Sequence, residues 1–448
     1  MRRVLFAALR HPLAVFGLAL TTASALLFLV LFLLDVTGQI TNHYVGLVTY
    51  VAMPALFVAG LVGIAVGARL GRTGPVPAWP RIDLNQPRQR QVLALLALAT
   101  GANLVVVSLA TYGGVTYMET DEFCGQVCHA PMRPQFTAHQ EGPHARIACV
   151  ACHIEPGAGG FFAAKLSGAG RLISVATGGY DRPIRQARGE GSSTRETRER
   201  CHWSELRRGD RPTPFREFAD DEANTEVTTA LRLHVGGGPP GQAEDIHWHA
   251  SAATMIDYVA VDGSADEIPI VRVTASDGTV REYRGEGADT LDLESAVTRR
   301  MDCLDCHNRP AHAFATSAAR AVDAALAVGR LDPTLPFIRR EAVRLLNEDY
   351  DGTDTAGDAI AVALDRFYTS NYPDLVATAP DRVRDAAAGV QALAVRNLFP
   401  DMGIDWGTHR RQIGHADERG CFRCHDERHV TDDGATIGQD CELCHSFE

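Results

Sequence analysis

The sequence predicts a membrane protein with three transmembrane helices, followed by an outer domain that is mainly α-helical and irregular and contains a small β meander. Three observations predict this fold class. Long apolar runs occupy much of the first 118 residues, the arginines around them are unevenly distributed, and the more polar remainder carries all eleven cysteines. A chain of 448 residues can hold a membrane anchor together with one large or two modest domains.

The three apolar runs are residues 12–34, 44–70 and 92–118. Each reaches the roughly 20 residues that cross a hydrocarbon core. The second run contains Pro54 and several glycines, which membrane helices tolerate. A cleaved signal peptide is the alternative for the first run. It is disfavoured because the run is too long and no small-residue cleavage site follows it. We therefore expect residues 1–118 to anchor the chain in the lipid bilayer.

The arginines predict how the anchor is oriented. Several precede the first run, none lies in residues 35–43, one lies at the end of the second run, and four lie between the second run and the third. These are Arg2, Arg3 and Arg10, followed by Arg69, Arg72, Arg81, Arg88 and Arg90. Because positive charge is retained in the cytoplasm, the N-terminus and the second loop are expected there. Everything after Met118 is then expected on the outer, periplasmic side of the cytoplasmic (inner) membrane.

Every cysteine in the chain belongs to a Cys-His element. Five motifs close a cysteine pair with a histidine: Cys124/Cys128/His129, Cys149/Cys152/His153, Cys303/Cys306/His307, Cys421/Cys424/His425 and Cys441/Cys444/His445. C-x-x-C-H is the attachment signature of c-type haem, in which the thiols form thioethers and the histidine binds iron. Zinc sites and disulfide frameworks do not require this histidine. The outer domain is therefore predicted to be a periplasmic multihaem domain.

Two of the Cys-His elements depart from the pattern. The first motif has three residues between Cys124 and Cys128 instead of two, a spacer that still accommodates haem. At Cys201-His202 the earlier cysteine is replaced by Arg198. That element either holds haem by one thioether or is a leftover buried cysteine. The sequence thus predicts five or six haem c groups.

Each buried haem needs a second axial ligand, most often histidine and sometimes methionine. The candidates outside the motifs are His144, His247, His249, His312, His415 and His429, together with His202 of the degenerate element and Met132, three residues after His129. Met132 has simple packing as its alternative. His139, His234 and His409 remain as less well-placed histidines.

The outer domain divides by composition into a segment 119–185 with the first two motifs, a segment 186–300 with the degenerate element, a polar linker and a small β region, and a helical C-terminal haem domain 301–448. Residues 258–284 alternate as strands, with a hairpin turn at Asp277-Gly278. Residues 313–329, 336–349, 356–370 and 380–397 have helical periodicity.

The charge balance limits the partners. The net charge is −12, and Lys165 is the only lysine. No basic block is present, so nucleic acid is not expected as a partner. The acidic balance suits a basic electron-transfer protein, although a solvated surface explains it equally well.

Residues 122–165, with F-C-G-Q-V-C-H-A-P-M and G-P-H-A-R-I-A-C-V-A-C-H-I-E-P-G, resemble the NapC/NirT family of membrane-anchored multihaem cytochromes. The three spans, M-D-C-L-D-C-H-N-R-P-A-H and C-F-R-C-H-D resemble the longer inner-membrane members found in respiratory chains that export electrons. The resemblance implies oxidation of menaquinol or ubiquinol from the membrane quinone pool and electron transfer to a periplasmic redox protein or cytochrome.

The same resemblance implies that Lys165 contacts the quinol, because the family keeps a lysine at this distance after the second motif. The family's acidic partner has no match here, and Arg171 stands in that neighbourhood. Pairing of Lys165 with a haem propionate is the alternative. Two other function classes remain open: a catalytic multihaem reductase of a small oxyanion, and an electron-conduit subunit without its own quinone site.

Overall fold

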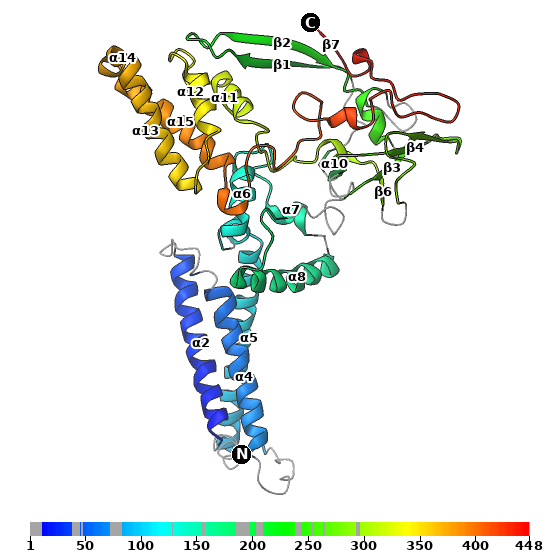
Figure 1. Ribbon diagram of the computed structural model, residues 1–448. Helices are drawn as coiled ribbons and strands as arrows, with labels where there is room; N and C mark the ends of the chain where they lie inside the picture. Colours follow the sequence, from blue (N-terminus) through cyan, green and yellow to red (C-terminus); the bar gives the residue numbers. More distant parts are fainter. Residues whose placement is uncertain are drawn as a thin grey trace. The chain divides into compact units, whose positions relative to one another are not determined.

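The structure, a computed structural model, describes residues 11–37, 45, 48–71, 83–127, 129–154, 157–184, 198–199, 201–202, 209–237, 244–251, 254–262, 265–292 and 296–447 (Figure 1). The chain divides into two compact units. Unit 1 comprises Met1–Arg133 and Ala148–Val150, and unit 2 comprises Pro134–Ile147 and Ala151–Glu448.

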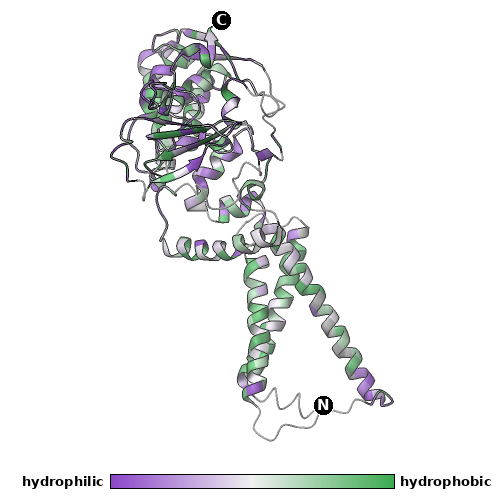
Figure 2. Ribbon diagram, turned by 90° about the vertical axis from the view of Figure 1, so that its right-hand side faces the viewer, coloured by the Kyte–Doolittle hydropathy of each residue, from purple (hydrophilic) through white to green (hydrophobic). Residues whose placement is uncertain are grey.

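Unit 1 is a set of long apolar helices: α2 (Pro12–Val36), α4 (Met53–Leu70), which follows a π-helical turn η1 (Val48–Ala52), and α5 (Pro87–Met118). Each begins with a proline in its first turn, where the missing N–H costs nothing. Two segments, Pro12–Asp35 and Val48–Leu70, have the length and apolarity to cross a membrane. These helices are mostly hydrophobic (Figure 2), and many of their large apolar side chains are exposed, as lipid contact requires.

Glycines let α2 and α4 approach each other closely. A Cβ atom on Gly17 would lie 2.6 Å from the Gly60 carbonyl oxygen and 2.6 Å from the Ile64 amide nitrogen. No side chain fits at that distance, so the backbones themselves are in contact. Small residues serve this purpose in membrane helix pairs, where lipid removes the hydrophobic drive for association.

The largest apolar core of unit 2 lies in a helical module, α11 to α15 (Figure 1). Its helices are α11 (Ala318–Ala327), α12 (Ile338–Leu346), α13 (Thr353–Asn371), the short α14 (Pro373–Thr378) and α15 (Pro380–Asn397). Ile360, Leu364, Tyr368 and Val390 have no exposed surface. The four helical segments expected from periodicity are confirmed, and α14 is an addition.

A four-stranded antiparallel sheet has the order β5-β4-β3-β6. Its strands are β3 (Met255–Ala260), β4 (Ile270–Thr274), β5 (Val280–Arg284) and β6 (Val297–Arg300). The hairpin between β4 and β5 is confirmed. Asp277 Oδ1 accepts a hydrogen bond from the Thr279 amide at 2.9 Å, and Gly278 has φ +84°. No pattern in the sequence predicts β6, which is short and largely exposed.

A second sheet lies where the sequence predicted only a polar linker, so that expectation is wrong. It has the order β1-β2-β7 and joins β1 (Arg211–Phe218), β2 (Glu226–Leu233) and β7 (His445–Phe447). Pro212 and Pro214 argue against a strand in the sequence, because proline is confined to the edges of sheets. The structure accommodates both because β1 is an edge strand. Through this sheet His445 pairs with Leu233, 212 positions earlier in the chain.

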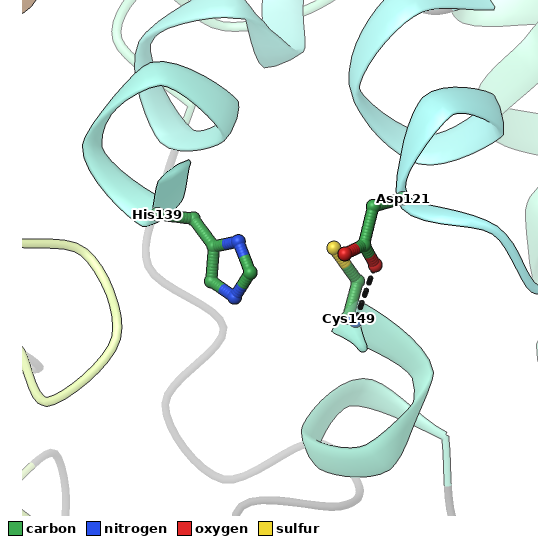
Figure 3. Close-up of side chains that lie close together, drawn as sticks. All are labelled: Asp121, His139 and Cys149. Carbon is green, nitrogen blue, oxygen red and sulfur yellow. Dashed lines mark hydrogen bonds between the residues drawn. The ribbon is translucent and has the colours of Figure 1, made fainter. Parts of the chain in front are cut away.

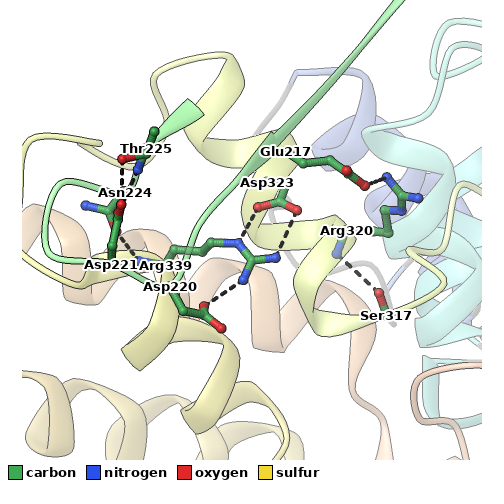
Figure 4. A network of polar contacts seen from close by, with 9 residues as sticks. All are labelled: Glu217, Asp220, Asp221, Asn224, Thr225, Ser317, Arg320, Asp323 and Arg339. Atoms are coloured by element: carbon green, nitrogen blue, oxygen red, sulfur yellow. Dashed lines mark hydrogen bonds and ion pairs between the residues drawn. The ribbon is translucent and has the colours of Figure 1, made fainter. Parts of the chain in front are cut away.

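Polar side chains tie the β1–β2 hairpin to the helical module (Figure 4). The Arg339 guanidinium on α12 binds Asp323 of α11 at 2.8 Å and Asp220, just after β1, at 2.6 Å. The amide of Asn224 donates to the carbonyls of Pro333 and Leu335 at 2.9 and 2.8 Å. The hairpin is therefore fixed to the module by side chains, with Phe218 as its contribution to the core.

Candidate functional site

The cysteine motifs of unit 2 sit on very short helical turns. They are α7 (Cys149–His153, which begins in unit 1), α10 (Cys303–Cys306), η6 (Gly420–Arg423) and η7 (Cys441–Leu443). A spacing of three residues places both thiols on one side of such a turn. In α10 the turn is fixed by a capping box: the Asp302 side chain accepts a hydrogen bond from the backbone amide of Asp305, and the Asp305 side chain accepts one from the backbone amide of Asp302.

The first motif lies in unit 1. Cys124 is on the π-helical turn η2 (Phe123–Val127), whereas Cys128 and the side chain of His129 lie outside the described residues. The Asp121 carboxylate accepts a hydrogen bond of 2.7 Å from the Cys149 amide (Figure 3). The Cys149 thiol also interacts with Cys124, which raises the pKa of Cys149. Asp121 therefore holds the start of the second motif beside the first. Met132 is half-buried on α6 (His129–Gln140).

The ten described cysteines form no disulfide. Burial raises the pKa of Cys306 and of Cys424 to about 12, so both thiols stay protonated at neutral pH. A buried neutral thiol is a poor candidate for a reactive nucleophile. Neither Cys306 nor Cys424 is therefore expected to act as a catalytic nucleophile.

Four motif histidines each face a second histidine within unit 2. The ring centroids are 6.1 Å apart for His153 and His312, 5.9 Å for His202 and His144, 5.8 Å for His425 and His249, and 6.0 Å for His445 and His415. Two metal–nitrogen bonds of about 2 Å, each with roughly 1.1 Å from nitrogen to ring centre, would place the centroids about 6 Å apart. The spacing is that of two imidazoles sharing one metal.

Backbone carbonyls fix which nitrogen of these rings is free. Nδ1 lies 2.9 Å from the Gln135 carbonyl in His312 and 2.8 Å from the Pro310 carbonyl in His144. His249 and His425 make the same contact, to Ile246 at 2.9 Å and to Gly438 at 2.8 Å. A carbonyl can only accept, so Nδ1 carries the proton and Nε2 presents its lone pair. Metal-binding histidines are oriented in this way.

Burial also keeps four of the site histidines neutral: His153, His249, His307 and His312. It lowers the pKa of His312 to about 4 and lowers the pKa of His153 and of His249. The pKa of His307 is lowered as well, first by burial and then by the charge of His247. Only an unprotonated imidazole can bind a metal, so these four histidines are in the required form at neutral pH.

The remaining sequence candidates behave differently. In His429, Nδ1 bonds to Asp426 at 2.8 Å and Nε2 lies 2.7 Å from the Ile268 carbonyl, so both nitrogens are used within the fold. The sequence ranked His139 too low. Its ring is 3 % exposed and lies 6.1 Å from His312, and its buried Nδ1 has no hydrogen-bond partner within the described residues. Only its position between the first two motifs marked it in the sequence.

Lys165 lies on α8 (Gly157–Thr177) and is half-buried. The next residue, Leu166, is 76 % exposed, and Ile173, seven residues later on the same face, is 66 % exposed. Large apolar side chains are rarely left in water when they cluster on one helix face. This face of α8 is suited to contact with an apolar partner or with lipid.

Neutral imidazoles opposed at metal-binding distance, beside paired thiols that form no disulfide, fit covalently bound haem. Apolar helices long enough to span a bilayer join this domain in one chain. Together they define a membrane-associated c-type cytochrome.

Comparison with known proteins agrees. The chain is 35% identical over 447 residues, 98% of its length and 88% of the relative, to the cytochrome c-type protein ImcH of Geobacter sulfurreducens. It therefore belongs to the family of that protein. No family profile matches the chain. No solved structure matches it either.

Proposed function

We propose that the protein takes electrons from quinol in the cytoplasmic membrane and passes them, through a row of bound haems, to a periplasmic redox protein. The row of cysteine motifs and opposed histidines carries this proposal. Helix α5, with 32 residues, is the third span, after α2 and α4. With the N-terminus in the cytoplasm, three crossings leave both sheets and the helical module in the periplasm.

The motif cysteines would hold the haems by thioethers, and the motif histidines would each bind one iron. The facing histidines would supply the second ligand: His312 for His153, His249 for His425 and His415 for His445, as their ring distances indicate. For His307 we propose His247, because it is the candidate histidine of unit 2 that neither these ring pairs, the His144–His202 pair nor the hydrogen bonds of His429 account for. For the first motif we assign His129 or Met132. Bound haem iron, alternating between ferric and ferrous states, would supply one-electron transfer.

The motifs follow one another in space in their chain order. Cys149 interacts with Cys124. Burial is the main cause that raises the pKa of Cys152, and the nearby Cys201 raises it further. Burial likewise raises the pKa of Cys306 and of Cys444, and Cys421 is the next contributor to each. Neighbouring attachment points are therefore close together, which is what electron transfer from one end of the domain to the other needs.

The quinol would bind at the membrane side of the first two motifs. Quinone is dissolved in the bilayer, and Cys124 follows Met118, the end of α5, by six residues. The exposed apolar face of α8 supports an interfacial position for that helix, and Lys165 is next to Leu166 on it. The NapC/NirT resemblance implies the same role for Lys165. Its ammonium would bind a quinol oxygen and favour loss of the proton.

The test uses the full chain in lipid vesicles with a menaquinol analogue, and records haem reduction by absorbance. Lys165→Ala should slow quinol-driven reduction at least tenfold and leave dithionite reduction and haem content unchanged. Ser167→Ala, an exposed change two residues away on the same helix, should keep the wild-type rate. A wild-type rate in Lys165→Ala would remove Lys165 from the site. Reduction by dithionite but never by quinol would favour the conduit alternative.

A further inference from the structure

We infer that Cys201 and His202 hold a haem through a single thioether, with His144 as its second axial ligand. The inference rests on the proposed function of the five complete motifs, and it raises the number of haems to six. Arg198 stands where a complete motif would have its first cysteine.

The first support is the backbone around Arg198. In two complete motifs the histidine amide bonds to the carbonyl of the first cysteine: His307 to Cys303 at 2.7 Å, and His425 to Cys421 at 3.1 Å. The His202 amide makes the same bond to the Arg198 carbonyl, at 2.8 Å. The attachment turn is therefore formed here although one thiol is missing.

The second support is the histidine opposite. The rings of His144 and His202 are 5.9 Å apart, inside the 5.8–6.1 Å range of the three pairs assigned to complete motifs. The Pro310 carbonyl holds Nδ1 of His144, so Nε2 of that ring is available as a ligand. This carbonyl lies 166 positions away in the chain, and so His144 is fixed by the fold rather than by its own loop.

The third support is the position of the element among its neighbours. His144, which faces His202, is bonded through Nδ1 to the carbonyl of Pro310, three residues after His307 of the third motif. The element therefore lies beside the third motif. Both Cys201 and His202 are exposed, so a porphyrin could bind there without displacing a packed core.

The attachment chemistry needs only one thiol. The Cys201 sulfur bonds to the inner carbon of one vinyl group, and the thiol hydrogen goes to the outer carbon, so the vinyl becomes a thioether-bearing ethyl group. This addition balances without an oxidant or reductant. The second vinyl group stays intact beside Arg198. A haem with one free vinyl has a pyridine haemochrome α-band between those of b-type and c-type haem.

The test measures covalent haem per chain by intact mass, and maps haem-bearing peptides. We expect six haems in the wild type, one of them on a peptide with Cys201 as its single cysteine. Cys201→Ala should lower the covalent count to five. Arg198→Cys should leave the count at six and move the intermediate α-band contribution to the c-type position. This second variant removes no ligand and keeps the test valid if Cys201→Ala fails to mature.

The axial ligand is tested separately by electron paramagnetic resonance. His144→Ala should keep six covalent haems but convert one low-spin signal to high-spin, and added imidazole should restore it. His234→Ala is the matched control, because the His234 ring pairs with Asp210 at 3.0 Å, and it should change neither count nor spin state. An unchanged low-spin spectrum in His144→Ala would overturn the assignment of that ligand.

Three possible results of the haem count distinguish a failure of this inference from a failure of the proposed function. Five haems in the wild type with an alkylatable Cys201 thiol would overturn this inference and leave the proposed function standing. A rise from five to six in Arg198→Cys would overturn it in the same way. Absence of covalent haem from the complete motifs would overturn the proposed function as well.

Discussion

The helical module and the motif turns of unit 2 are stabilised in different ways. The module buries whole side chains such as Leu364, Ile360 and Val390, each with no exposed surface. Helices α7 and α10 have four or five residues and no buried residue of their own. Isolated helices of that length are not stable in water. The module can therefore fold on its own apolar core, whereas the motif turns need partners from outside.

This contrast between the module and the motif turns indicates where bound haem would contribute to the stability of the fold. Histidines facing each other across about 6 Å at a metal-binding spacing leave room for a porphyrin between them. Bound haem would supply the apolar surface that the short turns lack. Binding free energy at such a site is also folding free energy, because the unfolded chain has no assembled site. Each of the following predictions changes one side of this comparison.

The largest effect is expected from preventing haem attachment. In cells without the c-type maturation machinery, the turns α7, α10, η6 and η7 should lose their protection against amide hydrogen exchange. Helices α13 and α15 should keep theirs, because their contacts are with each other. Loss of protection in both regions would show that the module also depends on haem.

A core truncation should act on the module alone. Leu364→Ala removes a fully buried side chain and should lower the free energy of unfolding of the module by about 2–5 kcal/mol. Val362→Ala, on the same helix but 58 % exposed, should change it by less than about 0.5 kcal/mol. Native-state hydrogen exchange of α13 measures both changes. Haem content should be wild-type in each variant.

The ion pair between α12 and the hairpin should have a smaller effect. Arg339→Met leaves the Asp323 carboxylate, whose side chain is 6 % exposed, without its guanidinium partner. We expect a loss of about 1–3 kcal/mol, since a buried polar group left unsatisfied has that cost. Arg384→Met is the control, because both partners of its ion pair with Asp381 are more than 70 % exposed. Equal losses in the two variants would contradict the argument.

The smallest effect is expected where the sheet contacts a motif. The Tyr258 hydroxyl on β3 donates to the half-buried Asp305 carboxylate inside the third motif. Burial raises the pKa of Asp305 from its ordinary value. Tyr258→Phe should lower local stability by about 0.5–1.5 kcal/mol, the usual net value of one hydrogen bond. Exchange in residues 302–308 should increase, with haem retained; no change there would show that the sheet does not support the motif.

The sequence predicted the parts of this molecule that depend on local patterns. Helical periodicity in 380–397 gave α15, and Asp277-Gly278 gave the β4–β5 turn. It did not predict the β1–β2–β7 sheet, because Pro212 and Pro214 argue locally against a strand and β7 joins from the far end of the chain.

At the predicted haem sites, too, the sequence predicted only what depends on local patterns. The spacing of the cysteines identified the attachment points, but the sequence did not say which histidine faces which. His144 and His202 are 58 positions apart, and His249 and His425 are 176 apart. Such pairs are set by the tertiary fold, and in the case of His144 by a carbonyl of a third segment. His429 was indistinguishable from a ligand until its two hydrogen bonds were known.

The central claim is that pairs of histidines hold the haems of unit 2. Near-infrared magnetic circular dichroism of the oxidised full-length protein in lipid tests it directly, because the charge-transfer band differs between bis-histidine and histidine–methionine iron. The account predicts a bis-histidine band equivalent to at least four haems, and at most one haem with another ligand set, that of the first motif. Predominantly histidine–methionine or high-spin iron would contradict it.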